Sequence, residues 1–278
     1  MKIAVTAASG QLGHAIIQAL LELVPRQNII ALARSPEKIT DLDVEIRPGD
    51  YDQPNQLESS LTDIDTLLLV SGMTDPRDRI QQHRNVINAA KKMGVNKIVY
   101  TSIQGAENGN AFSPIVQSNR LTEQDVTNSG LKWVIGRNGI YIEPDVEYID
   151  SYKKLGTISN CAGDGKCGYT TRGELAYAYA KMLIEEKHNG KCYNLHGTAI
   201  SQQQLTHFLN LAFNTELTYK AISNNEFLAD RTAELGEFIG TVITGIYQGI
   251  NAGYVDNESH FKEASGRNHI SWAEYFNL

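Results

Sequence analysis

The sequence contains few cysteines, and their spacing suits neither a metal site nor a disulfide framework. Only three occur in 278 residues, Cys161, Cys167 and Cys192, and no two are spaced as Cys-x-x-Cys. An odd number without paired spacing indicates neither disulfides nor structural zinc. The seven histidines are scattered; we interpret those on helical stretches, His83 and His207, as surface residues. We expect no metal at the functional site.

The sequence also lacks long apolar runs and basic clusters. No apolar stretch approaches the ~20 residues that a membrane helix requires, and the sequence begins with a strand pattern rather than a signal peptide. Charged residues make up 21% and the net charge is −7, which argues against nucleic acid as the main partner. We expect a cytoplasmic protein with no membrane and no nucleic-acid partner. Its oligomeric state is open, and a homodimer is one alternative.

What is present at the N-terminus is a strand–turn–helix pattern. An apolar strand over residues 2–6 leads into the turn Ala7-Ala-Ser-Gly10 and then into an apolar-periodic helix over residues 12–23. This order brings backbone N–H groups and the positive end of a helix dipole to one point, an arrangement that holds a pyrophosphate. Cofactor contacts are therefore predicted at Thr6, Ala8, Ser9, Gly10, Gln11 and Leu12.

The glycine pattern of this turn is incomplete, because the three positions read Ala7, Gly10 and Gly13. The missing first glycine normally permits the tight turn and keeps a side chain away from the phosphates. Since alanine is the smallest replacement, we expect Ala7 to accommodate the turn with a negative φ. A small-residue turn that binds no nucleotide is the alternative for this pattern alone.

The residue after the second predicted strand indicates which dinucleotide is bound. Arg34 directly follows the apolar run at residues 28–33. NAD-binding proteins usually have Asp or Glu there, which binds the ribose 2′-hydroxyl, whereas the planar guanidinium of arginine suits a 2′-phosphate. Ser35 and Lys38 are additional donors. We predict NADPH as the cofactor; a solvated arginine after an edge strand is the alternative.

Apolar runs and helical patterns alternate up to residue 142. Further strands are predicted at residues 44–50, 67–70, 97–102 and 131–135, and helices at 80–93 and 114–129. This alternation predicts an α/β fold, a Rossmann-type doubly wound parallel sheet. Ligands bind such sheets at the carboxyl ends of the strands. Cofactor contacts are therefore also predicted at Asp50, Ser71, Gly72, Thr101, Ser102, Asn138, Gly139 and Tyr141.

The alternation fades after residue 142, where helices are predicted at 174–184, 202–211 and 225–237. No linker rich in Pro, Gly or Ser separates these helices from the sheet. We interpret residues 1–142 as the NAD(P)-binding domain and residues 143–278 as a smaller α/β substrate-covering domain. Segments around residues 170–190 are expected to return to the first domain.

Tyr177 and Lys181 have the Tyr-x-x-x-Lys spacing of short-chain dehydrogenases, in which the phenol donates a proton and the lysine lowers its pKa. In those enzymes the pair lies on the helix after the fifth strand. Here that helix is the segment 114–129, which contains neither Tyr nor Lys. We therefore interpret the helix that carries Tyr177 and Lys181 as structural.

Several segments together resemble one family. They are Thr6-Ala-Ala-Ser-Gly-Gln-Leu-Gly-His14, Gln82-His-Arg-Asn-Val-Ile-Asn-Ala-Ala-Lys91, Tyr100-Thr-Ser102, Ser129-Gly130, Arg137-Asn-Gly-Ile-Tyr141 and Ala162-Gly-Asp-Gly-Lys166. On these segments the sequence resembles the NmrA-like atypical short-chain dehydrogenases/reductases, which include bacterial NADPH:quinone oxidoreductases and triphenylmethane reductase. The matches are spread over most of residues 1–185, and the C-terminal part matches only loosely.

The resemblance implies hydride transfer from NADPH to a quinone or similar flat acceptor without a Tyr–Lys pair. It places the nicotinamide near residues 137–143, next to a predicted loop at 137–141. Since a quinone accepts hydride readily and its reduced oxyanion is a weak base, catalysis depends mainly on positioning. We assign Asn138 and Tyr141 as candidate catalytic residues: Asn138 orients the nicotinamide or donates to a carbonyl, and Tyr141 stacks on a flat ring or donates through its hydroxyl. Ser102 is expected to contact the ribose.

Two residues depart from the family pattern. Ala7 replaces the first glycine, and Asn119 stands where relatives usually have Lys or His. An NmrA-like protein that binds NADP(H) as a redox sensor, and acts through a protein partner without chemistry, therefore stays an alternative. A sugar-nucleotide epimerase is a further alternative, and the missing Tyr–Lys pair argues against it.

Overall fold

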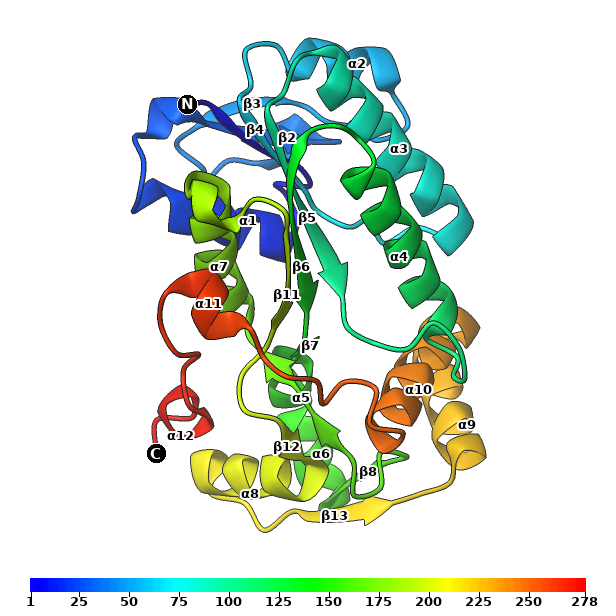
Figure 1. Cartoon of the computed structure of the whole chain (residues 1–278). Coiled ribbons are helices and arrows are strands. Elements are labelled where there is room, and N and C mark those ends of the chain that lie inside the picture. Colours follow the sequence, from blue (N-terminus) through cyan, green and yellow to red (C-terminus); the bar gives the residue numbers. More distant parts are fainter.

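A seven-stranded sheet forms the centre of the computed structural model, which describes residues 1–278 (Figure 1). Its strands are β1 (Ile3–Val5), β2 (Ile29–Ala33), β3 (Glu45–Pro48), β4 (Thr66–Leu69), β5 (Lys97–Ile103), β6 (Lys132–Asn138) and β11 (Lys191–Leu195). They are ordered β11-β6-β5-β4-β1-β2-β3, and all neighbours are parallel. The strand order reverses between β1 and β4, which is the point where a Rossmann fold binds its dinucleotide. The predicted fold class is confirmed.

Helices cover both faces of this sheet, as its apolar strands require. Every residue of β1, β2 and β4 is buried, which is typical of parallel strands covered on both sides. The helices α1 (Gln11–Leu21) and α7 (Arg172–Ile184) pack on one face, and α2 (Pro54–Ser60), α3 (Pro76–Lys92) and α4 (Ser113–Thr127) on the other (Figure 1). The carboxyl ends of the strands are left uncovered by these helices.

A smaller unit lies below these strand ends in the view of Figure 1 and has its own apolar core. Its helices are α5 (Glu143–Glu147), α6 (Ile149–Leu155), α8 (Gln202–Phe213), α9 (Asn224–Leu235), α10 (Glu237–Asn251) and α12 (Trp272–Tyr275). Its two-stranded pairs are β7 (Ile140–Tyr141) with β10 (Tyr169–Thr170), β8 (Thr157–Asn160) with β13 (Thr218–Ala221), and β9 (Lys166–Cys167) with β12 (Ile200–Ser201). Short turns of 3₁₀-helix occur at Arg26–Asn28, Pro36–Lys38 and Glu186–His188.

Three segments beyond residue 142 lie with the sheet. Helix α7 packs on α1, strand β11 pairs with β6, and α11 (Phe261–Ser265) packs on α7 and β11. Of these, α7 lies within the segment around residues 170–190 that was expected to return, whereas β11 and α11 lie beyond it. The domain boundary at residue 142 itself stays a prediction.

Two predicted elements differ from the structure. The segment 137–141 is not a loop: Arg137 and Asn138 end β6, and Tyr141 lies in β7. The chain stays extended there because Gly139 passes directly against the Gly168 carbonyl, where a side chain would collide. The helix predicted at 225–237 is α9, which ends at Leu235, and a second helix that the sequence reasoning did not predict, α10, begins at Glu237 after Gly236 with φ +83°. Such a φ interrupts a helix and favours glycine.

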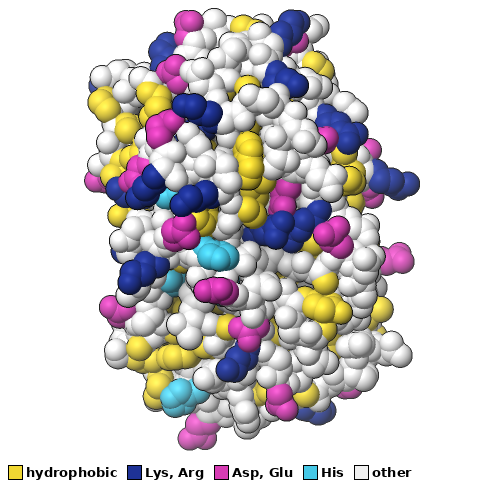
Figure 2. Space-filling view, viewed as in Figure 1, with side chains coloured by type: hydrophobic (Ala, Val, Ile, Leu, Met, Phe, Trp, Pro, Cys, Tyr) yellow, Lys and Arg dark blue, Asp and Glu magenta, His cyan; other side chains and the backbone are white.

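No helix of the structure is long and apolar enough to cross a membrane. On the face drawn in Figure 2, basic and acidic side chains alternate, and no continuous basic surface is visible.

Candidate functional site

The turn before α1 presents unpaired backbone donors. Helix α1 begins at Gln11 after Gly10, no side chain caps it, and its first turn contains no acidic residue. The first N–H groups of a helix have no intrahelical acceptor, so these point out with the positive end of the dipole. The turn is fixed to the sheet because Ala8 N donates to the Leu32 carbonyl at 3.0 Å. A pyrophosphate fits this donor set without a competing carboxylate.

Ala7 does not have the negative φ expected from the sequence; its φ is +49°. The geometry of the turn imposes this positive φ, because the Ala7 carbonyl accepts from Gly10 N at 2.9 Å and lies against the first turn of α1 at Gly13. A Cβ on Gly13 would come within 2.5 Å of that carbonyl oxygen. The left-handed conformation costs a non-glycine residue roughly 1–2 kcal/mol. The alanine is therefore tolerated under strain.

Arg34 directly follows β2 and has an exposed side chain with no ion pair or hydrogen bond to the protein. Lys38, in the 3₁₀ turn that follows, is likewise exposed, and Ser35 is partly buried. Because Leu32 is bonded to the turn before α1, these donors lie at the same edge of the sheet as that turn. Their assignment to a 2′-phosphate stays a prediction.

The Thr6 hydroxyl is used within the protein. It accepts from Val70 N at 2.9 Å and lies 2.5 Å from the Tyr51 hydroxyl, which donates to the Val70 carbonyl. Thr6 is fully buried. Its side chain therefore ties β1 to the end of β4. Asp50, after β3, is half-buried and accepts from Asp52 N at 3.1 Å.

Asn119 joins α4 to the ends of β4 and β5. Its Oδ1 accepts from the Tyr100 hydroxyl at 2.6 Å and from Ser71 Oγ at 3.1 Å, and its Nδ2 donates to the Ile115 carbonyl. Ser71 N also donates to Thr101 Oγ1 at 2.8 Å. The departure from the family pattern at Asn119 thus fills a buried position at which both ends of the amide are hydrogen-bonded. The hydroxyls of Ser71 and Thr101 serve this network.

His83 is buried, so its interpretation as a surface residue is wrong, while His207 is exposed as expected. Gly72 N donates to His83 Nε2 at 3.1 Å, and His83 Nδ1 lies 2.9 Å from Thr122 Oγ1. Burial lowers the pKa of His83 to about 3, with a smaller effect from Arg79. The neutral ring accepts at Nε2 and donates from Nδ1, which fixes the tautomer. This bond holds the loop after β4 in place.

Glu123 on α4 forms a cluster that the sequence reasoning missed. Its Oε1 accepts from Ser102 Oγ at 2.5 Å and from Arg120 at 2.6 Å, and Arg137 binds both of its oxygens, at 2.9 and 2.6 Å. The Ser102 hydroxyl is therefore donated to a carboxylate. One sequence signal could have indicated this cluster: Arg120 and Glu123 are spaced i,i+3 on the helix that follows the strand of Ser102, a spacing that favours an ion pair.

Asn138 and Tyr141, the two predicted catalytic residues, lie together. Asn138 is 5% exposed, and its Nδ2 lies 3.4 Å from the Tyr141 hydroxyl as donor. Its Oδ1 is 2.6 Å from the hydroxyl of Tyr179 on α7, a residue that the sequence did not single out. The guanidinium of Arg172 lies 5.4 Å from the centre of the Tyr141 ring. Burial raises the pKa of Tyr141 to about 12, so its phenol is protonated at neutral pH.

Tyr177 and Lys181 contact other groups. Lys181 pairs with Glu185 at 3.6 Å, and the guanidinium of Arg267 lies 4.4 Å from the centre of the Tyr177 ring. Neither side chain bonds to Ser102 or Asn138. The pair therefore lacks the contacts of a short-chain dehydrogenase site.

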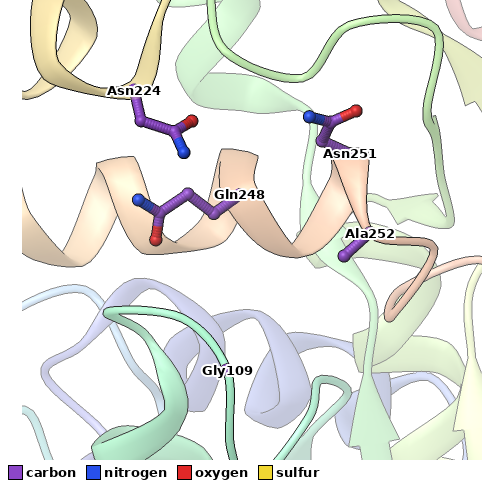
Figure 3. Close-up of a pocket in the computed structure, with 5 residues that line it drawn as sticks. All are labelled: Gly109, Asn224, Gln248, Asn251 and Ala252. Atoms are coloured by element: carbon purple, nitrogen blue, oxygen red, sulfur yellow. The ribbon is translucent and has the colours of Figure 1, made fainter.

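Two pockets lie near the strand ends and the smaller unit. The first has a volume of about 260 Å³ and is lined by Gln104, Gly105, Ala106, Arg120, Arg137, Asn194, Gly253, Tyr254 and Asn257. The second, about 310 Å³, is lined by Gly109, Asn224, Gln248, Asn251 and Ala252, and Figure 3 shows its three amide side chains, from α9 and α10. The second pocket has no titratable group and includes none of the predicted site residues. The first adjoins Asn138, because Gln104 N donates to the Asn138 carbonyl at 2.9 Å.

The sheet order, the uncapped start of α1 and the residues at the strand ends define a dinucleotide-binding α/β protein. The family described as NAD(P)H-binding matches residues 7–183. The chain belongs to this NmrA-like family of NAD(P)H-binding proteins. The family membership expected from the sequence is confirmed.

Relatives and solved structures cover nearly the whole chain. Quinone oxidoreductase 2 of Escherichia coli is 36% identical over 233 residues, which is 82% of this chain and 80% of the relative. An Escherichia coli NADPH-dependent quinone oxidoreductase in complex with NADPH has a TM-score of 0.91 at 31% identity and covers 99% of this chain and 98% of its own. Triphenylmethane reductase of Citrobacter sp. with NADP(H) has a TM-score of 0.92 at 32% identity and covers 99% of each chain.

Proposed function

We propose that the protein is a reductase that transfers a hydride from NADPH to a quinone or a similar flat acceptor. The observation that carries the proposal is the edge of the sheet at which the uncapped start of α1, the unpaired Arg34 and the pair Asn138–Tyr141 all lie. Similarity to the quinone oxidoreductase of Escherichia coli and to structures that contain NADPH or NADP(H) supports both the cofactor and the acceptor.

The residues at this edge fit the cofactor. The N–H groups at the start of α1 would donate to the pyrophosphate, and Arg34 with Lys38 would bind the 2′-phosphate through charge-assisted hydrogen bonds. When bound, NADPH supplies the hydride. Asn138 Nδ2 has two hydrogens, and only one is donated within the protein, to the Tyr141 hydroxyl; the other would donate to the nicotinamide amide or to the quinone carbonyl.

Tyr141 serves as the polar contact for the acceptor. Its phenol stays protonated over the working pH range, because burial raises its pKa to about 12. It therefore donates to the oxygen on which negative charge develops, and a proton from water completes the two-electron reduction to the hydroquinone. The hydroquinone anion is a weak base, so its protonation does not require a strong general acid. The Ser102 hydroxyl donates to Glu123, so its hydrogen is not free for the acceptor.

The test combines turnover with direct binding. NADPH oxidation is followed by its absorbance with a panel of benzoquinones and naphthoquinones, and NADPH affinity is measured by titration. Turnover with at least one quinone supports the proposal. Tight NADPH binding without turnover selects the redox-sensor alternative, and absence of binding contradicts both functions.

A cytoplasmic location is part of the proposal. The buried thiols of Cys161 and Cys167 are unpaired, which suits a reducing compartment. Cell fractionation tests the location. Sedimentation of the purified protein decides whether it is a homodimer.

A further inference from the structure

The pocket of about 260 Å³ beside Asn138 is enclosed by the carboxyl ends of β5, β6 and β11 and by residues 253–257. In Figure 1 the segment between α10 and α11 runs across, below these strand ends. The side chains that line the pocket are almost all polar. A pocket of this size and polarity, next to the predicted site of hydride transfer, is placed to receive a polar substituent of the acceptor.

The pocket has more positive than negative charge at its wall. Arg120 and Arg137 both line it, and both bind the same carboxylate, Glu123. Arg120 uses only Nη1 for its bonds, and Arg137 uses only Nε and Nη2. The remaining guanidinium donors, Nη1 of Arg137 and Nε and Nη2 of Arg120, have no protein partner. Two cations against one carboxylate leave one net positive charge and several free donors.

Glu107 is the other carboxylate that acts on these two arginines. Its negative charge acts to raise the pKa of both guanidinium groups, yet its side chain is exposed and forms no ion pair with either. It therefore weakens the positive potential without occupying the donors. Removing its charge is expected to strengthen any anion binding in the pocket.

Gln104 adds an unpaired donor to the same wall. Asn257 Nδ2 donates both to the Tyr254 carbonyl at 3.2 Å and to Gln104 Oε1 at 3.1 Å, which fixes the orientation of both amides. Gln104 Nε2 then has no partner, although the residue is only 1% exposed. A buried amide N–H without an acceptor is unfavourable, so Gln104 Nε2 is a donor beside the pocket that the protein itself leaves without a partner.

We propose that this pocket binds an anionic substituent of the quinone, a carboxylate or sulfonate, and that the protein therefore prefers acidic quinones to neutral ones. The inference rests on the proposed function. Arg137 and Asn138 are neighbours at the end of β6, and their side chains leave opposite faces of the sheet, Arg137 toward Glu123 of α4 and Asn138 toward Tyr179 of α7. The proposal therefore places the ring across the carboxyl end of β6, with its anionic substituent on the α4 face and the ring carbonyl toward Asn138 and Tyr141. The substituent thus orients the ring for hydride transfer as well as adding affinity.

The first test compares naphthoquinone with naphthoquinone sulfonate as acceptors. The measured quantity is the ratio of kcat/KM for the sulfonate to kcat/KM for the neutral quinone, so that intrinsic differences between the quinones cancel between variants. Arg137→Gln should lower this ratio about tenfold, equivalent to about 1.4 kcal/mol. Arg137→Lys should keep most of it because the charge is retained, and Glu107→Gln should raise it.

Arg84→Gln is the matched control, since it removes one positive charge from a surface pair with Asp125 on the outside of α3 and α4. Its ratio should stay within about twofold of the parent. A ratio that is unchanged by Arg137→Gln, or lowered equally by Arg84→Gln, overturns the inference.

A second test does not depend on turnover. Binding of naphthalenesulfonate, which accepts no hydride, is measured by calorimetry on the full chain with NADP⁺ present. Binding that weakens about tenfold in Arg137→Gln, equivalent to about 1.4 kcal/mol, and not in Arg84→Gln supports the anion site even if no quinone is reduced. Absence of binding to the parent protein overturns the site, whereas quinone turnover would still support the proposed function.

Discussion

The hydroxyl of Tyr179 lies 2.6 Å from Oδ1 of Asn138, and this contact joins helix α7 to the end of β6. Tyr179 is completely buried and also lies 2.9 Å from the Gly136 carbonyl. It therefore fixes the Asn138 amide with its NH₂ group toward Tyr141. Helix α7, which carries Tyr177 and Lys181, thus contributes a different tyrosine, Tyr179, to the predicted site.

Tyr179→Phe should lower kcat for quinone reduction severalfold and leave the KM for NADPH nearly unchanged, because it frees the Asn138 amide without touching the phosphate-binding residues. The lost hydrogen bond should also lower the free energy of unfolding by about 1 kcal/mol. Steady-state kinetics and denaturant unfolding measure the two effects. Tyr177→Phe, on the same helix, is the control and should stay within about twofold of the parent in kcat. Equal losses in both variants would show that the helix is merely sensitive to change.

Arg34→Ala should weaken NADPH binding by about 1.5–3 kcal/mol, the range of hydrogen bonds to charged groups, and leave NADH binding nearly unchanged. The reason is that only NADPH has the 2′-phosphate that the free guanidinium would contact. Titration with each cofactor measures the difference. Arg77→Ala, which removes an arginine that is 91% exposed at the start of α3, is the control for lost surface charge. A similar loss for NADPH and NADH would remove Arg34 from the 2′-phosphate site.

Ala7→Gly should raise the free energy of unfolding, by up to about 1 kcal/mol. The φ of +49° strains the alanine by roughly 1–2 kcal/mol, and this exceeds the 0.4–1 kcal/mol or so that glycine loses through unfolded-state entropy. A negative φ, as expected from the sequence, would have given the opposite sign. Ala8→Gly, at a neighbouring residue without positive φ, should destabilise and serves as the control in denaturant unfolding. Destabilisation by Ala7→Gly would mean that its methyl group contributes packing that outweighs the strain.

The inner strands of the sheet could be predicted from the sequence because they contain short, continuous apolar runs, whereas the edge strand β11, which has exposed and polar residues, was not predicted. The run at residues 67–70 is an example: a strand covered on both faces cannot alternate, and β4 is buried throughout. Its neighbours in the sheet follow from the right-handed crossovers. The turn before α1 and Arg34 could be proposed as cofactor contacts because both adjoin such strands directly.

Features that depend on packing between distant segments could not be predicted. The φ of Ala7 is different: the glycine usual at this position was a local signal for a positive φ, and the expected negative φ was wrong because the alanine was assumed to avoid it. Glu123 binds Arg137 only because α4 crosses the sheet beside β6. The sequence therefore predicts the residues at the strand ends, but not charged partners such as Glu123 that bind them.

His83 should make the protein acid-sensitive in a defined pH window. Its pKa is about 3 when buried in the folded protein, against an ordinary value of about 6.5. The unfolded state therefore binds one more proton than the folded state between these values. The free energy of unfolding should fall as the pH falls below about 6.5, by up to about 1.4 kcal/mol per pH unit from this group, until about pH 3.

His83→Gln isolates this contribution from that of the carboxylates. Glutamine can accept from Gly72 N and donate to Thr122 while it binds no proton, so the loop after β4 keeps its bonds. The variant should lose less stability than the parent between pH 7 and 4 in denaturant titrations, whereas His207→Gln, at an exposed histidine of α8, should follow the parent. Parallel pH curves for the parent and His83→Gln would mean that His83 is protonated in the folded protein without cost. That result would contradict the bond from Gly72 N, since a protonated ring has no free Nε2 lone pair to accept it.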